Sequence, residues 1–142
     1  MRQEIRKVLS ANDVGETGAH QAGILVPKAK QILAFFPDLD PSVKNPRVTL
    51  AMREKSDSTR WDFNFIYYNN RLFGGTRNEY RLTCMTQYLR SINARVGDEL
   101  VFSVDDNSSY VLDLVRASRS TALVNEDGVL VLSGGWTVIN TR

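Results

Sequence analysis

Short segments in which apolar and polar residues alternate constrain the fold of this chain more than any other feature of its sequence. Alternation occurs over 47–53 and 61–68, and two further apolar segments, 99–104 and 110–115, flank the polar run 105–109. A period of two is typical of strands that bury one face, and a polar turn between two such segments predicts a hairpin. Short strands joined by turns favour a mainly β fold, a barrel or a sandwich, over a parallel sheet.

The remaining predicted elements are shorter. We expect further strands at 5–9, 81–83 and 129–132, which brings the total to about seven, with 136–139 as a candidate last strand and a return of the chain to the core at 22–26. Pro27 suits the start of a helix, the apolar residues that follow through Phe36 have helical spacing, and Pro37 ends it. A second short helix is predicted over 85–92.

The composition favours one globular domain that spans residues 1–142. No apolar run approaches the length of about 20 residues that a membrane helix needs, and no apolar block follows the first residues as in a signal peptide. We therefore expect a cytoplasmic protein with no membrane partner. Cys84 is the single cysteine of the chain, so it cannot form an internal disulfide, and we expect it to pack in the interior.

The charged residues are segregated along the chain. Eight Lys or Arg and four Asp or Glu lie within 44–81, whereas 97–113 holds five acids and no base. This division predicts a basic surface suited to a phosphate backbone, with two solvated surfaces and no partner as the alternative.

Catalytic and metal-binding patterns are absent from the sequence. His20 is the single histidine, so no two-histidine metal site can form, and no Cys/His cluster suits zinc. A nuclease needs clustered carboxylates to hold a metal ion, but the adjacent Glu54 and Lys55 would point to opposite faces of a strand. We expect no catalytic residue and no metal site in this chain; a nucleophilic Cys84–His20 pair is the disfavoured alternative.

Two polar segments, 10–21 and 67–81, combine residue types that can contact base edges in DNA. Arginine donates two hydrogen bonds to guanine, asparagine pairs in the same way with adenine, and glutamate accepts from cytosine. In an extended chain Arg77, Glu79 and Arg81 share one face, where the glutamate would orient both arginines through charge-assisted hydrogen bonds. The alternatives are a surface salt-bridge ladder in the second segment and an ordinary connecting loop in the first.

These segments resemble the two signature stretches of the N-terminal effector domain of EcoRII-type restriction endonucleases. The stretches are 9–23, LSANDVGETGAHQAG, and 66–81, IYYNNRLFGGTRNEYR. They occur in the family's order and at a similar separation, and Val26-Pro27 before a predicted helix also fits. The resemblance covers most of residues 5–83. Residues 96–102 also resemble the beginning of a later strand in the family's fold.

The resemblance implies an open pseudobarrel of about seven strands with one or two short helices, the DNA-binding architecture shared with plant transcription factors of the B-three type. Two arms, at about 10–21 and 70–81, would clamp the major groove of double-stranded DNA. Residues of these arms that match family contacts, together with their polar neighbours, form the predicted contact set: Asn12, His20, Gln21, Arg71, Arg77, Asn78, Glu79, Tyr80 and Arg81.

The sequence departs from the family's pattern at three positions. Gly75 and Tyr80 occur where lysine is expected, and Leu25 occurs where tyrosine is expected. The loss of two cations should weaken phosphate contacts and flatten the dependence of binding on salt. Whether the bound site is CCWGG or a relative of it stays open, and the retained Arg–Glu–Arg set favours a site that contains G and C.

Cleavage chemistry lies in a separate domain of such enzymes. The resemblance therefore implies a monomeric domain that binds DNA without a cofactor and works with a nuclease domain, linked or separate, which would use magnesium. A stand-alone DNA-binding regulator, an unrelated protein-interaction barrel and a compact nuclease are the alternatives.

Overall fold

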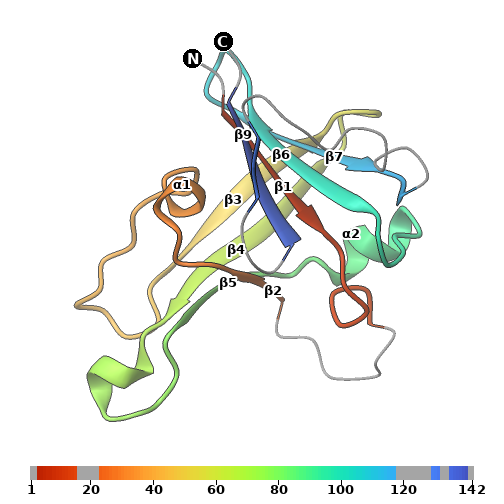
Figure 1. Cartoon of the computed structure of the whole chain (residues 1–142). Coiled ribbons are helices and arrows are strands. Elements are labelled where there is room, and N and C mark those ends of the chain that lie inside the picture. The colour runs from red at the N-terminus through yellow and green to blue at the C-terminus, as the bar shows by residue number, and fades with distance from the viewer. Residues whose placement is uncertain (1–2, 16–22, 118–128, 132–134, 141–142) are drawn as a thin grey trace.

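The computed structural model describes residues 3–15, 23–117, 129–131 and 135–140, and the strands of these residues form one continuous sheet (Figure 1). The strands are β1 (Gln3–Val8), β2 (Ile24–Val26), β3 (Arg47–Glu54), β4 (Arg60–Tyr68), β5 (Glu79–Thr83), β6 (Glu99–Val104), β7 (Tyr110–Val115), β8 (Val129–Val131) and β9 (Trp136–Asn140). Their order in the sheet is β2-β5-β4-β3-β7-β6-β1-β9-β8. Neighbours are antiparallel except for the parallel pair β3–β7. The mainly β prediction is confirmed, with nine described strands instead of about seven.

The sheet curls until its two ends approach each other, but no strand pairing closes it among the described residues. β2 and β8 are the two end strands. The Trp136 indole N–H of β9 donates to the Leu25 carbonyl of β2 at 3.1 Å, which joins the two sides across the seam. The architecture is therefore an open pseudobarrel, as the family resemblance implied.

Alternate residues of the long strands β3 and β4 fill the interior of the curled sheet. Phe63 and Phe65 of β4 are at most 1% exposed, and they pack in one cluster with Leu82, Phe102 and Trp136. The hairpin predicted over 99–115 is present, with Val104 opposite Tyr110 beside its turn. The polar partners of this alternation lie on the outer face of the sheet and supply the candidate site described below.

The first predicted helix is much shorter than its apolar pattern indicates. The helix α1 covers only Lys30–Leu33, because the chain stays extended through Ala29 (φ −61°, ψ 131°) after leaving β2. Beyond α1 the backbone tightens, with the Phe35 N–H donating to the Ile32 carbonyl and the Phe36 N–H to Leu33. This turn buries both adjacent phenylalanines, so tertiary packing overrides the helical period.

The second predicted helix is confirmed as α2 (Thr86–Ser91), and a short 3-10 helix, η1 (Asn70–Phe73), lies between β4 and β5. The expectation that Cys84 packs in the interior is wrong: it is exposed, with φ of 68°, at the bend between β5 and α2. Within the described parts of the chain, no helix is long and apolar enough to cross a membrane.

Candidate nucleic-acid interface

Two loops project from the same side of the pseudobarrel, and β2 lies between them (Figure 1). The first arm follows β1, and its described part is 10–15. The second arm is the hairpin tip between β4 and β5, which includes η1 and residues 74–78. The topology places the described parts of both segments that the sequence singled out at opposite edges of one surface.

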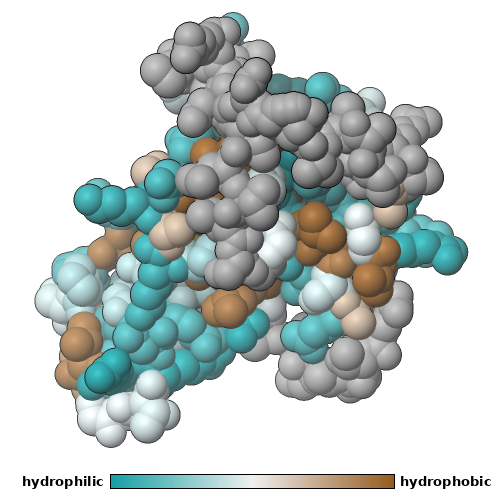
Figure 2. All heavy atoms as spheres, viewed as in Figure 1, coloured by the Kyte–Doolittle hydropathy of each residue, from teal (hydrophilic) through white to brown (hydrophobic). Residues whose placement is uncertain are grey.

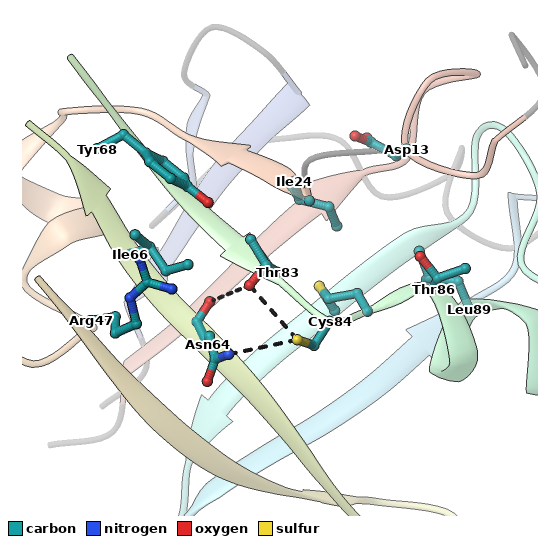
Figure 3. A pocket seen from close by; sticks show the side chains of 12 residues that line it. Asp13, Ile24, Arg47, Asn64, Ile66, Tyr68, Thr83, Cys84, Thr86 and Leu89 are labelled. Carbon is teal, nitrogen blue, oxygen red and sulfur yellow. Dashed lines mark hydrogen bonds between the residues drawn. The ribbon is translucent and has the colours of Figure 1, made fainter. Parts of the chain in front are cut away.

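A groove lies on the outer face of the sheet between these arms (Figure 3). Tyr68 and Arg47 border it at the base of the second arm, and Asp13 of the first arm borders it on the other side. Its floor and remaining wall come from β2, β4, β5 and α2: Gly23, Ile24, Asn64, Ile66, Thr83, Cys84, Met85, Thr86 and Leu89. Hydroxyl, amide and guanidinium groups therefore face one opening.

Strand register places two arginines in one row across this outer face. Ile66 of β4 lies opposite Arg47 of β3 on one side and opposite Arg81 of β5 on the other. Arg81 in turn lies opposite Leu25 of β2. Directly paired residues of a sheet point to the same face, so these four side chains share the outer face, with Arg47 at its β3 side.

Arg77, Glu79 and Arg81 lie together on one face, as alternation predicted. The Glu79 Oε2 atom accepts from Arg81 Nε at 2.6 Å and from Arg77 Nη2 at 3.1 Å. Arg81 Nη1 also donates to the Gly23 carbonyl at 2.9 Å, which ties the second arm to the start of β2. The cluster leaves part of each guanidinium open to solvent, with side-chain exposures of 37% for Arg77 and 19% for Arg81.

The electrostatics of this cluster keep Glu79 ionised. Desolvation by partial burial acts to raise the pKa of Glu79, but hydrogen bonds and charges from Arg81 and Arg77 outweigh it and lower the pKa below its usual range. An ionised carboxylate accepts hydrogen bonds only, so it holds both guanidinium groups in fixed directions. Arg77 is further positioned by Tyr68, whose ring centroid lies 3.7 Å from the guanidinium carbon.

The described part of the first arm is a tight turn anchored to β1. The Ser10 hydroxyl accepts from the Asp13 N–H, while the Asp13 carboxylate accepts from the Ser10 N–H at 2.9 Å. Lys7 Nζ lies 3.1 Å from Asp13 Oδ2, and both side chains are 8% exposed. A buried ion pair therefore sets the direction in which the first arm leaves the sheet.

The structure brings some predicted contact residues together and separates others. Asn12 and Arg81 line a second hollow, which runs beside Leu25 of β2. Arg71 is exposed on the second arm, where its backbone N–H donates to the Arg77 carbonyl. His20 and Gln21 lie outside the described residues.

Tyr80 and Asn78 face away from the Arg–Glu–Arg cluster. The Tyr80 ring stacks on Tyr67 at a centroid distance of 4.3 Å and on Phe65 at 5.6 Å, on the interior side of β5. The Asn78 side chain accepts from the Tyr67 hydroxyl at 2.8 Å. This placement gives both residues a supporting position under the second arm, on the opposite face from Glu79.

The surface of the second arm is mainly hydrophilic, with hydrophobic spots at its edge (Figure 2). Leu72 and Phe73 of η1 are 62% and 45% exposed, and Gly74 ends η1 in the left-handed conformation with φ of 90°. The tip therefore offers apolar as well as polar atoms to a partner.

Of the groups considered for catalysis, His20 and therefore the Cys84–His20 pair lie outside the described residues, and Glu54 is buried. Glu54 is 5% exposed and accepts from the Tyr88 hydroxyl at 2.6 Å, which gives it a place in the core. Across the described ranges, no three His, Cys, Asp or Glu side chains gather closely enough to hold a metal ion.

Sequence reasoning missed Arg47, Asn64 and Tyr68 as members of this surface. The alternation of β4 indicated which residues face inward, and the outward set of Asn64 and Tyr68 follows by parity. The role of Arg47 required the register of β3 on β4, which the sequence does not reveal.

The strand order, the open seam and the paired arms define the pseudobarrel class of folds. An Arabidopsis FUS3–DNA complex superposes with a TM-score of 0.62 at 22% identity, covering 79% of this chain and 95% of that one. The B3 domain of the UbaLAI restriction endonuclease, solved with cognate DNA, has a TM-score of 0.61 at 22% identity and covers 97% of this chain and 86% of its own. These likenesses establish the fold.

The chain belongs to the family described as restriction endonuclease EcoRII, N-terminal, whose model matches residues 4–118. The type II restriction enzyme EcoRII of Escherichia coli is 43% identical over 79 residues, 54% of this chain and 19% of the enzyme. Auxin response factor 5 of Arabidopsis thaliana is 30% identical over 118 residues, 82% of this chain and 12% of that protein. The chain thus spans no more than a fifth of the length of these relatives.

Proposed function

We propose that this chain binds double-stranded DNA sequence-specifically, as the target-recognition or effector domain of a type II restriction endonuclease. The observation that carries the proposal is the cluster in which Glu79 holds Arg77 and Arg81 on the outer face between two arms. Two partly exposed guanidinium groups beside a carboxylate match the donor and acceptor pattern of G·C pairs in the major groove.

The arms at about 10–21 and 70–81 would grip the groove from its two sides. Arg77, Glu79 and Arg81 would read bases, while Asn12, His20, Gln21 and Arg71 would add contacts from the arms. Asn78 and Tyr80 would support the second arm from the opposite face of the sheet, since both contact Tyr67 at the base of this arm. The site would contain G and C, and CCWGG or a relative of it is the first candidate.

Selection from a randomised duplex library, without divalent metal, tests the proposal. Parent protein should enrich one short motif, and Arg77→Ala or Glu79→Ala should each lose about 1–3 kcal/mol of binding free energy and relax the preference at one base pair. Arg60→Gln is a matched control, because Arg60 is exposed at the far end of β4. Enrichment of no motif by the parent, or unchanged preference in both variants, would contradict the proposal.

A stand-alone DNA-binding regulator is the second candidate. The similarity to auxin response factor 5 over most of this chain favours a regulator, but it covers 12% of that protein and so does not bear on whether the domain stands alone. A nuclease domain in the same reading frame, or a neighbouring methyltransferase gene, would favour the endonuclease. Cutting of a plasmid by the purified chain with magnesium would instead indicate a compact nuclease, for which the described residues offer no carboxylate cluster.

A further inference from the structure

Arg47 stands at the β3 border of the groove, beyond both arms. It lies opposite Ile66, which separates it in the register from Arg81. Adjacent strands are about 4.8 Å apart, so the two arginine backbones are roughly 10 Å apart on one face. Figure 3 shows the Arg47 guanidinium beside Ile66, at the same border of the groove as Tyr68.

Among the described residues, the guanidinium group of Arg47 forms no ion pair with a carboxylate. Its one hydrogen bond there runs from Nε to the Asn45 carbonyl at 3.3 Å. Four other arginines of this region contact carboxylates: Arg53 with Asp105, Arg60 with Asp62, and Arg77 and Arg81 with Glu79. Arg71 resembles Arg47 in forming no ion pair among the described residues, but it lies in η1 on the second arm and not on the sheet. An arginine without an acidic partner, at the edge of a polar groove, keeps its full charge for an external anion.

We infer that Arg47 binds a backbone phosphate of the duplex, so that the DNA footprint extends from the arms across β4 to β3. The inference rests on the proposed function and adds a contact outside both arms. We assign Arg47 a phosphate contact and not a base contact because it lies at the border of the groove, whereas Arg81 lies between the arms. Contacts to phosphates at the border set register and affinity without reading sequence.

Ile66 supports this geometry. It is 2% exposed although it lies on the outer face, outside the main core cluster. The stems of long cationic side chains commonly cover such apolar atoms while their charged ends reach solvent. Arg47 is exposed and Arg81 is partly exposed, and both are register neighbours of Ile66, so their stems would cover it from its two sides.

Binding of parent and variants to the selected duplex and to a random duplex, over a series of KCl concentrations, tests the inference. Arg47→Gln should weaken binding to both duplexes by about tenfold and lower the slope of log K against log salt by about 0.9. Arg47→Lys should keep the slope. Arg60→Gln removes the same charge on the same face, roughly 20 Å away along the strands, and should leave both quantities near the parent values.

The outcomes separate this inference from the proposed function. If the parent binds its selected site and Arg81→Ala loses it, but Arg47→Gln behaves like Arg60→Gln, the phosphate contact is wrong and the proposed function stands. A loss on the selected duplex alone would also overturn it, because that indicates a base contact. If the parent binds no duplex, the proposed function is wrong, and the inference that rests on it is wrong as well. Thermal unfolding of each variant verifies that the fold is intact.

Discussion

The guanidinium carbon of Arg77 lies 3.7 Å from the centroid of the Tyr68 ring, over its face. Tyr68 is the last residue of β4 and lies opposite Glu79 in the register, so the ring and the carboxylate hold Arg77 from two sides. A cation held in this way loses little additional freedom when it meets DNA.

Replacement of Tyr68 by leucine should therefore weaken binding to the selected duplex. The expected loss is about 0.5–1 kcal/mol, the size of a partly exposed cation–π interaction. Fluorescence anisotropy measures it, with Tyr68→Phe as the control that keeps the ring. Equal affinities of the leucine and phenylalanine variants would show that the ring does not position Arg77.

The pKa of Glu79 should report the integrity of the Arg–Glu–Arg cluster. Its folded-state pKa lies below its usual range because the hydrogen bonds and charges of Arg81 and Arg77 outweigh desolvation. The stabilisation is thus present above the unfolded pKa of about 4.3 and is lost as pH falls through the lower folded pKa.

An NMR titration of the Glu79 side-chain carboxyl carbon measures this pKa directly. In Arg81→Gln the pKa should rise, since a donor and a charge are removed while the desolvation remains. Arg53→Gln, at the other end of the outer face, serves as the control. A Glu79 pKa that is the same in the parent and in Arg81→Gln would refute the coupling.

The buried Lys7–Asp13 pair should be the main anchor of the first arm. With both side chains 8% exposed, removal of one partner breaks a buried ion pair, so Lys7→Met or Asp13→Asn should cost about 3–5 kcal/mol in the free energy of unfolding. The double variant should cost less than the sum of the two, because its buried charges are absent together. Urea unfolding measures all three, and strict additivity would argue against the pair.

Gly23 should tolerate no side chain at the entry to β2. Its φ is +89°, and a Cβ there would lie 2.5 Å from the Leu82 carbonyl oxygen. Gly23→Ala should destabilise the fold by about 1–3 kcal/mol. It should also weaken DNA binding, since the Gly23 carbonyl accepts from Arg81.

Thermal unfolding and DNA binding of the same variant measure the two effects. Gly74→Ala serves as a comparison for Gly23→Ala. Gly74 also has a positive φ, of +90°, but nothing lies within 4 Å of its added Cβ. The Gly74 variant should therefore show backbone strain alone. If Gly23→Ala were as stable as the parent, the close approach of β2 to β5 would not constrain this position.

Elements whose evidence is local could be predicted from the sequence. The alternation in 61–68 identified the inward phenylalanines of β4, and the polar run 105–109 identified the β6–β7 turn. The prediction that Arg77, Glu79 and Arg81 share a face also followed from alternation, because it needs no knowledge of the neighbouring strand.

Features that depend on contacts between distant segments could not be predicted in this way. The strand β2 has three residues and owes its existence to pairing with β5, more than fifty positions later. The helix α1 is shorter than its pattern because two adjacent phenylalanines turn into the core, and Cys84 is exposed because the chain bends there with a positive φ.

The amino-acid sequence by itself therefore determined the β character of the chain, its two polar arms and the chemistry those arms carry, since side-chain alternation and residue type are local properties. Only the tertiary structure decided that Arg47 shares a row with Arg81, that Tyr80 lies on the opposite face from Glu79, and that Lys7 holds the first arm. Strand register, curl and burial arise from pairing between residues far apart in the chain, and a one-residue shift in register would have turned each of these side chains to the other face.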